Sequence, residues 1–427
     1  MIPARGDELL RFQREGGGLI PRGNGRAYGD AAIGTRQTMV MGAFNRMRSF
    51  DPETGLLTVE AGTLLSDIIA TFLPRGYFPS VVPGTKFVTV GGMLAADVHG
   101  KNHHSIGGFG EHVAHFTLAA PDSAVLSCSR EENQELFFAT IGGMGLTGTV
   151  LDVTLKLLPV ETGWITETTM VASNLAEALR LLDARPDLPY SVAWIDCLAR
   201  GQSLGRSLVC LGGHAQRDSL AQPETQASRW GRIGTQRLSV PVDLPGFALN
   251  RWSVAALNEF YFRRGAARAG RPFLTDWSSY FFPLDTIGNW NRVYGKRGFL
   301  QHQCVIPGAK AESVLGQMLE HIARRGNASF LAVLKRLKAG TGLLSFPMEG
   351  YTLALDLKIE DGVFAFLDEL DRVVVEGGGR LYLAKDARQS PGTFEAGYPQ
   401  RQAFCRVRQA LGARRKMESY QAKRLGL

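Results

Sequence analysis

Residues 83–113 read PGTKFVTVGGMLAADVHGKNHHSIGGFGEHV, and this stretch decides how the rest of the chain is interpreted. It holds seven glycines, at 84, 91, 92, 100, 107, 108 and 110, together with four histidines. Glycines let a backbone turn sharply and approach a bulky, flat ligand without a Cβ in the way. We expect a short strand at Phe87–Val90, followed by a short helix or loop at Gly91–Val98. The stretch therefore indicates a binding site for a large cofactor.

Two further glycine-rich turns have the same character, PRGNGRAYGD at 21–30 and IGGMGLTGTV at 141–150. A Gly-x-Gly turn alone is a weak signal, because a glycine-rich loop without a ligand gives the same pattern. Neither the Rossmann fingerprint nor the P-loop pattern is present. Phosphates would instead be held by backbone N–H groups in turns, with Arg22 or Arg26 nearby.

Together these motifs resemble the FAD-binding half of the vanillyl-alcohol-oxidase superfamily of flavoproteins, and more narrowly the decaprenylphosphoryl-β-D-ribose oxidase family. The resemblance continues in YSVAWID at 190–196, GFLQHQCVIP at 298–307, GGRLYLAKD at 378–386 and AKRLGL at 422–427. It implies an α+β, two-domain FAD-binding type-2 (PCMH, vanillyl-alcohol-oxidase-like) fold. The FAD domain would comprise residues 1–162 and 379–427, and residues 163–378 would form a substrate domain built on an antiparallel sheet. Members of the family usually have more residues ahead of the first turn, so we expect its strand to be short or missing.

The activity implied by the resemblance is FAD-dependent oxidation of a secondary hydroxyl. The substrate would be the C2 hydroxyl of a polyprenyl-phosphate-linked pentose, and the product a keto-sugar formed by hydride transfer to flavin N5. A separate NAD(P)H-dependent keto-reductase would complete an epimerisation. An aldonolactone or alditol oxidase acting on a free sugar is the alternative within the fold. A non-catalytic flavin- or nucleic-acid-binding protein is the alternative from another class.

The resemblance also implies which residues contact FAD. They are Pro21, Arg22, Gly23, Asn24, Gly25, Arg26, Ala27, Tyr28, Gly29 and Asp30 in the first turn, then Gly84, Thr89, Val90, Gly91, Gly92, Ala96, Asp97, Val98, His99, Gly100 and Asn102, and finally Gly145, Val150 and Tyr382. Several members of the superfamily attach FAD covalently through a histidine in the first turn. Arg26 occupies that position here, so we expect the flavin to be bound non-covalently.

Lys385 and His99 are the candidate catalytic residues. Flavin-dependent alcohol oxidation requires a base for the hydroxyl proton and a positive group where negative charge accumulates on the reduced ring. Lys385 resembles a family lysine that lies against both flavin and substrate, although a solvated lysine at a strand end is the ordinary alternative. His99 either transfers a proton or positions the substrate. No cysteine or carboxylate set completes a metal site with the histidines, so we expect no metal.

The candidate substrate-binding residues are Tyr28, Gln301, Gln303, Lys335, Arg292 and Lys385. Gln301 and Gln303 alternate in one strand and so point to the same face, where they suit sugar hydroxyls, unless that face is exposed to solvent. By resemblance Lys335 lines the pocket, and a cation at Arg292 would hold the phosphate. Thr352 and Ala354 replace an asparagine and a cysteine found in the best-known members of the family.

Composition limits the other possibilities. The chain has 427 residues, of which 44% are hydrophobic and 21% charged. It contains no apolar run long enough for a transmembrane helix, and its N-terminus lacks the apolar region of a cleaved signal peptide. The five cysteines lack CxxC spacing, which favours a reducing compartment. We expect a cytoplasmic protein, with peripheral association at the inner membrane face left open. The net charge of +8 has no accompanying nucleic-acid-binding motif, so no nucleic-acid partner is expected.

Periodicity predicts the main elements. Helices are expected at Asp7–Arg14, Leu64–Leu73, Ala311–Arg325 and Asp361–Glu376, the last ended by Gly377–Gly379. Strands are expected at Leu19–Ile20, Leu57–Glu60, Val150–Leu158, Ser191–Ile195, Phe299–Ile306 and Tyr351–Lys358. Residues Gly212–Asn250 are rich in Gly, Gln, Ser, Arg and Pro, which predicts a long surface loop or lid.

Overall fold

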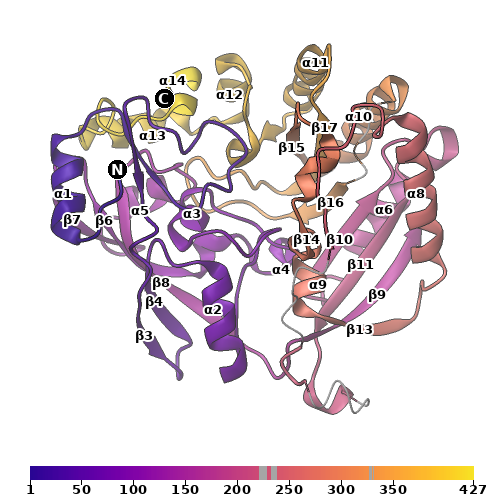
Figure 1. Cartoon of the computed structure of the whole chain (residues 1–427), viewed down its shortest axis with the longest axis horizontal. Coiled ribbons are helices and arrows are strands. Elements are labelled where there is room, and N and C mark those ends of the chain that lie inside the picture. The colour runs from indigo at the N-terminus through magenta and orange to yellow at the C-terminus, as the bar shows by residue number, and fades with distance from the viewer. Residues whose placement is uncertain (221–227, 232–237, 327–328, 330) are drawn as a thin grey trace.

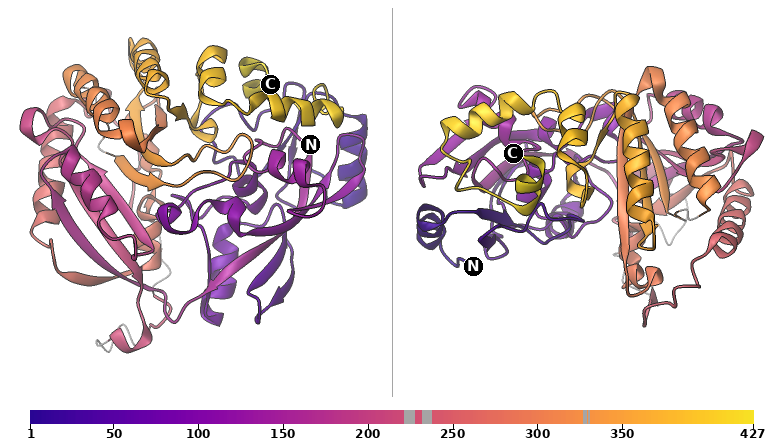
Figure 2. Two further views of the ribbon diagram at one scale, coloured as in Figure 1. Left: turned by 180° about the vertical axis from the view of Figure 1, so that it is seen from behind. Right: turned by 90° about the horizontal axis from the view of Figure 1, so that it is seen from above.

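The computed structural model describes residues 1–220, 228–231, 238–326, 329 and 331–427. Two β-sheets lie side by side in it, one built from the N-terminal part of the chain and one from the middle (Figure 1). The C-terminal helices return to the N-terminal side and lie over it (Figures 1 and 2). The fold is thus α+β with two domains, as the sequence predicted. The boundaries at residues 162 and 378 stay a prediction.

The first sheet has six strands in the order β3-β4-β8-β6-β7, with β5 also paired to β8. A separate parallel pair, β1 and β2, lies beside it. The strands are β1 (Leu19–Arg22), β2 (Gln37–Val40), β3 (Met47–Asp51), β4 (Leu56–Glu60), β5 (Tyr77–Pro79), β6 (Val113–Ala119), β7 (Val125–Ser129) and β8 (Thr149–Pro159). The predicted first strand is present and short, because β1 has four residues.

The second sheet has eight strands in the order β13-β9-β11-β10-β16-β17-β15-β18, and every neighbouring pair in it is antiparallel. The strands are β9 (Trp164–Ala172), β10 (Tyr190–Ile195), β11 (Ser207–His214), β13 (Pro272–Asp276), β15 (Phe299–Pro307), β16 (Ala332–Leu337), β17 (Gly350–Lys358) and β18 (Arg380–Leu381). A short pair, β12 (Leu238–Ser239) and β14 (Ile287–Gly288), lies apart from it.

The helices fall into three groups along the chain. The N-terminal group is α1 (Gly6–Glu15), α2 (Leu65–Phe72), α3 (Val90–Ala95), α4 (His103–Ile106) and α5 (Gln134–Thr140). The middle group is α6 (Leu175–Asp183), α8 (Arg251–Ala266), α9 (Trp277–Phe281), α10 (Ala311–Arg325) and α11 (Val363–Glu376). The C-terminal group is α12 (Pro391–Gly397), α13 (Arg401–Ala410) and α14 (Tyr420–Leu425).

The two faces of the eight-stranded sheet have opposite characters. On one face, α6, α10 and α11 contribute leucines such as Leu179, Leu315 and Leu367 to a core that includes the strand residues Leu334 and Leu353. Successive side chains alternate between the faces of a strand. Lys335 and Thr352, the next residues after Leu334 and before Leu353, therefore lie on the other face. A polar face is thus turned away from α6, α10 and α11.

One predicted strand is wrong. Phe87–Val90 forms only an isolated bridge between Leu64 and Thr89, and Val90 already begins α3. The Thr89 hydroxyl caps this helix by accepting a hydrogen bond from the Gly92 N–H group at 3.3 Å. The β-branched residues that predicted a strand instead serve as a cap and a first helical residue.

The predicted lid is only partly described. Gly212–His214 belong to β11, so the irregular segment begins later than expected. A 3-10 turn at Arg217–Ser219 and β12 lie within the rest of it. The parts at 221–227 and 232–237 lie outside the described residues.

Candidate functional site

The polar face of the eight-stranded sheet gathers the predicted substrate residues. Gln301 and Gln303 lie on β15, opposite Asp356 and Ala354 of β17. Lys335 lies on β16, opposite Thr352 of β17. Three adjacent strands thus bring two amides, a cation and a carboxylate to one side of the sheet. The structure confirms that the two glutamines share a face.

His99 reaches this face from the glycine-rich segment that follows α3. Its side chain is buried, with Nε2 2.9 Å from the Gln303 amide nitrogen and Nδ1 3.1 Å from Lys335 Nζ. A neutral imidazole has only one N–H group. The Gln303 amide nitrogen donates to Nε2 and, at 3.1 Å, to the Thr352 hydroxyl, so the single ring proton lies on Nδ1 and faces the Lys335 amine. Both ring nitrogens are therefore committed to fixed partners.

Burial controls the charge of His99 and Lys335. Desolvation holds the pKa of His99 well below its usual value, and the charges of Lys335, His103 and Lys385 lower that pKa further. The pKa of Lys335 falls to about 7, first because the amine is buried and then because Lys101 and Lys385 repel its charge. His99 is therefore neutral at neutral pH.

Lys385 lies in a 3-10 turn, Leu383–Lys385, directly after β18. Its ammonium group lies 4.0 Å from the centre of the Tyr28 ring, so two predicted site residues meet here. Burial lowers the pKa of Lys385 to about 8, and the negative charge of Asp356 opposes that shift. This amine can therefore change its protonation state near neutral pH.

Asp356 is the site residue that the sequence prediction missed. Its carboxylate is buried and accepts hydrogen bonds from the Gln301 amide at 2.5 Å and from the Tyr294 hydroxyl at 3.4 Å. Burial raises its pKa to about 6. A signal was available, since Asp356 is the one carboxylate in the apolar strand YTLALDLK and alternates onto the same face as Thr352. A buried strand carboxylate needs a partner, and Lys385 supplies the charge.

The first glycine-rich turn lies against the Lys385 segment. The Tyr28 N–H group donates to the Ala384 carbonyl at 3.0 Å. A Cβ on Gly29 would lie 2.0 Å from the Asp386 carbonyl oxygen, and a Cβ on Gly23 would lie 2.1 Å from the Thr89 hydroxyl oxygen. Glycine is required at both positions because backbone and hydroxyl groups approach so closely.

This turn also offers unused hydrogen-bond donors. Within the described residues, no hydrogen bond is made by the backbone N–H groups of residues 23–27. By contrast, the N–H groups of Val90 and Gly91 at the start of α3 donate to Thr63 and Ala61 carbonyls. A run of free amides in a glycine-rich turn suits a phosphate. The chain therefore fits the diphosphate of FAD at residues 23–27.

The other predicted cofactor residues hold the segment in shape. The buried Asp97 carboxylate accepts hydrogen bonds from the Ser345 hydroxyl and the Gly110 N–H group, and burial raises its pKa. The Asn102 amide donates to the Ser80 carbonyl at 2.7 Å. The Tyr382 hydroxyl donates to the Ala96 carbonyl, and the Tyr382 ring lies 5.5 Å from the His99 ring.

The remaining predicted cofactor residues lie within the three glycine-rich segments. Gly92, Val98, Gly100 and Gly84 lie in the second segment, and a Cβ would meet nothing within 4 Å at Gly84. Gly145 has a φ of 77° and lies beside Pro21 at the end of the third segment. Val150 lies in β8, and its side chain belongs to the core of the six-stranded sheet. Asn24 donates to the Phe87 carbonyl, and the Arg26 guanidinium lies 5.6 Å from the Phe87 ring.

Arg292 and Asp30 are not brought into the cluster around His99. The Arg292 guanidinium donates to the Pro241 and Val240 carbonyls, at 2.5 and 3.4 Å. Asp30 forms an ion pair with Arg424 of α14 at 2.8 Å. Arg424 also binds Asp386, next to Lys385, so Asp30 ties the first turn to the Lys385 segment.

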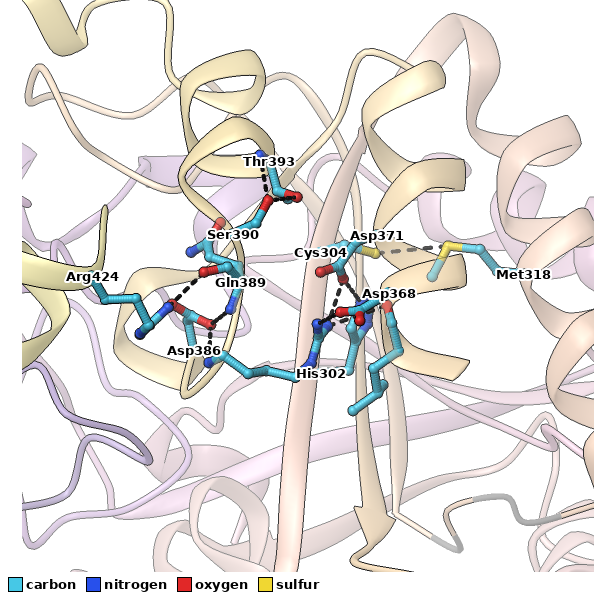
Figure 3. A network of polar contacts seen from close by, with 12 residues as sticks. His302, Cys304, Met318, Asp368, Asp371, Asp386, Gln389, Ser390, Thr393 and Arg424 are labelled. Carbon is cyan, nitrogen blue, oxygen red and sulfur yellow. Dashed lines mark hydrogen bonds and ion pairs between the residues drawn. The ribbon is translucent and has the colours of Figure 1, made fainter. Parts of the chain in front are cut away.

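A second set of ion pairs joins the segment after Lys385 to α11 (Figure 3). The Arg388 guanidinium binds Asp371 and Asp368 of α11, each at 2.7 Å. Asp371 also lies 3.0 Å from Nε2 of His302, which points away from the polar face of β15. Asp386 accepts the N–H groups of Arg388 and Gln389. The segment 385–389 is thus tied to α11 on one side and to α14 on the other.

A small cavity opens between these parts, lined by residues that include Gln301, Gln303, Tyr382 and Lys385. The described part of the chain contains no cluster of three or more His, Cys, Asp or Glu side chains able to hold a metal ion.

Comparisons with known proteins identify the family of the chain. A family described as the FAD binding domain matches residues 8–129. Decaprenylphosphoryl-beta-D-ribose oxidase of Mycolicibacterium smegmatis is 36% identical over 98% of this chain and 92% of its own length. A Streptomyces coelicolor protein, described only as uncharacterized, is 35% identical over 83% of this chain and 97% of its own length. Mouse L-gulonolactone oxidase is 32% identical, but over only 37% of each chain. The chain is therefore an FAD-dependent oxidoreductase that belongs to the decaprenylphosphoryl-β-D-ribose oxidase family.

Proposed function

We propose that this enzyme oxidises the C2 hydroxyl of a polyprenyl-phosphate-linked pentose to a keto-sugar. The observation that carries the proposal is the group formed by the buried Asp356 and the half-buried Lys385 and Tyr28, beside the two glutamines of β15. It provides a titratable base and amide groups for sugar hydroxyls in one place. A relative named as an oxidase of a decaprenylphosphoryl ribose matches the chain over 98% of its length.

Lys385 is the proposed proton acceptor. When bound, FAD supplies the ring that accepts a hydride from the carbinol carbon. The hydroxyl proton must then pass to a group of the protein, and an efficient base has a pKa near the working pH. The pKa of Lys385, about 8, meets that requirement. The ammonium formed by proton uptake is stabilised by Asp356.

His99 is the proposed positioning residue rather than the base. Its pKa lies well below the usual value, and both ring nitrogens already face Lys335 and Gln303. These contacts fix the imidazole and orient the Gln303 amide on the polar face. Gln301 and Gln303 would then bind sugar hydroxyls, while Lys335 would favour an anionic substrate. Arg292 remains the predicted partner of the phosphate.

FAD is proposed to be held without a covalent bond. Arg26 replaces the attaching histidine, and the free amides of residues 23–27 suit the diphosphate. Denaturation followed by precipitation should leave all of the flavin absorbance in the supernatant. Flavin that stays with the precipitated polypeptide would contradict this.

A lactone or alditol oxidase is the competing function. The mouse L-gulonolactone oxidase match favours it, but that match covers only 37% of the chain. Anaerobic reduction of the bound flavin, followed as bleaching of its visible absorbance, separates the two functions. We expect polyprenyl-phosphoryl pentoses to bleach the flavin and free lactones and alditols to leave it oxidised. The opposite preference would replace the proposed substrate class.

The keto-sugar product requires a second enzyme if the overall reaction is an epimerisation. A carbonyl at C2 can be reduced from the other face only by a hydride donor. We therefore propose an NAD(P)H-dependent keto-reductase as the functional partner. The test is to supply the reductase with NAD(P)H and the oxidised product, and to identify the C2 epimer.

A further inference from the structure

The outer face of helix α8 exposes large apolar side chains that the proposed chemistry does not use. Trp252 is 74% exposed, Phe260 is 63% exposed and Leu257 is 45% exposed. The loop that leads into the helix adds Phe247, which is 79% exposed. Single exposed apolar residues are common on protein surfaces, but a contiguous group of them marks an interaction site. We call these four residues the α8 patch.

The patch lies on one side of an ordered helix. Trp252 and Phe260 are eight residues apart, about two helical turns, and so lie on the same side of α8. The opposite side is anchored to the eight-stranded sheet. The Asn258 amide on that side donates to the Asp196 carboxylate at 2.8 Å, and Val254 beside it is buried. The exposure of the patch therefore results from the way the helix is held, and not from a loose segment.

Arginines surround the exposed apolar residues. Residues 251–271 contain five arginines, at 251, 263, 264, 268 and 271, and one acidic residue, Glu259. All five arginines are exposed. Tryptophan and phenylalanine beside arginines are the composition of helices that lie in the interface of an anionic bilayer. The apolar groups enter the headgroup region while the guanidinium groups bind lipid phosphates.

We propose that α8 docks this enzyme on the surface of an anionic lipid bilayer. A second copy of the chain is a poorer occupant, because a symmetric contact through this face would bring two sets of arginines together. No helix among the described residues is both long enough and apolar enough to cross a bilayer. Surface docking through exposed apolar and cationic side chains needs no such span.

The position of α8 suits a substrate that arrives from a membrane. Tyr261 of α8 packs against Trp194 of β10, with ring centres 4.9 Å apart. Trp194 pairs with Val333, two residues before Lys335, so Trp194 and Lys335 share a face of the sheet. From β15 to β11 this face crosses four strand spacings, or roughly 20 Å at about 4.8 Å per strand. The docking helix and the candidate site therefore occupy the same side of the sheet.

Figure 1 shows where the matched control lies. Helix α8 is at one end of the molecule and α1 at the other. Arg11 and Arg14 of α1 are exposed arginines like those of α8. Phe364 of α11, 50% exposed, is an exposed apolar side chain on another helix. Removing these groups lowers the positive charge and the exposed apolar area without changing a residue of α8.

The experiment is co-sedimentation of the FAD-bound enzyme with vesicles, in the absence of any sugar. Vesicles of phosphatidylcholine alone are compared with vesicles that also contain phosphatidylglycerol. We expect binding only to the anionic vesicles. The pair Trp252→Ser with Phe260→Ser, and the pair Arg263→Gln with Arg264→Gln, should each weaken it at least tenfold. The control variants Arg11→Gln with Arg14→Gln, and Phe364→Ser, should bind as the unchanged enzyme does.

Failure of the wild-type enzyme to bind anionic vesicles would overturn the proposal, as would equal binding by all variants. Sedimentation velocity tests whether a second copy of the chain, rather than a bilayer, covers the patch. If the unchanged enzyme self-associates without lipid and the Trp252→Ser, Phe260→Ser variant does not, the patch is an interface between copies. Unchanged FAD content and circular dichroism show that each variant is folded. Because no sugar is present, failure of the docking proposal is distinguishable from failure of the proposed oxidation.

Discussion

Two half-buried lysines and one buried carboxylate lie at the centre of the site. The charge of Lys385 lowers the pKa of Lys335, whereas Asp356 stabilises the charged form of Lys385. The two amines have pKa values of about 7 and about 8. Strongly shifted pKa values in a buried group of this kind are typical of functional sites. At the scale of single residues, three neighbouring groups have pKa values shifted toward neutral pH, which suits proton uptake by Lys385.

Replacing Lys385 by alanine tests its role directly. We expect Lys385→Ala to retain FAD, because the free amides of residues 23–27 are unchanged. Loss of a positioned base costs about 10²- to 10⁴-fold. Anaerobic flavin bleaching by the pentose substrate should therefore slow at least about 100-fold. Lys310→Ala, at an exposed lysine, is the control and should bleach normally. Full bleaching activity in Lys385→Ala would remove Lys385 from the mechanism.

Replacing Asp356 by asparagine should move the pH profile. If neutral Lys385 is the base, the rate of flavin bleaching rises as pH passes through about 8 and then levels off. Asp356→Asn removes the negative charge that raises the pKa of Lys385. The rise should then occur at a lower pH. An unchanged midpoint would show that Asp356 does not act on the titrating group.

At the scale of elements, helices with one apolar face were predictable from sequence. Ala311–Arg325 agrees with α10 at both ends, because its apolar residues recur with helical spacing and pack on the sheet. The run FVTV at 87–90 was misread as a strand. Its local composition favours a strand, but the Thr89 cap and the bond from Val90 N–H to the Thr63 carbonyl favour a helix start. The Thr63 partner is distant in sequence and gives no local signal.

The ion pairs between α11 and the Lys385 segment support a stability prediction. Arg388 is largely buried, and so is its partner Asp371. Removing one partner of a buried pair leaves an uncompensated charge, so Arg388→Met should lower the free energy of unfolding by about 3–5 kcal/mol. Arg297 pairs with the exposed Asp361, and Arg297→Met should cost about 0–1 kcal/mol. Urea unfolding of the FAD-bound protein measures both changes. Equal losses in the two variants would show that the Arg388 pair stabilises the fold no more than an exposed pair does.

At the scale of the whole molecule, the motifs predicted which segments form the site but not every contact between them. His99 and Lys335 are 236 residues apart in sequence, and their contact depends on the packing of the two sheets. Alternation in β15 predicted that Gln301 and Gln303 share a face, and the structure confirms it. Alternation also places Asp356 on the face of Thr352, but its pairing with Gln301 depends on the register between β15 and β17, which the sequence does not show. Arg292 was assigned from its neighbours, whereas its present contacts follow from the loop at Val240 and Pro241.

The most direct test of the whole account is anaerobic flavin reduction by a polyprenyl-phosphoryl pentose that has deuterium at C2. The account predicts that this substrate bleaches the bound flavin and does so more slowly than the unlabelled one, because the C2–H bond breaks in that step. Deuterium at another ring carbon should leave the rate unchanged. Equal rates for the C2-labelled and unlabelled substrates, or no bleaching by either, would contradict oxidation at C2.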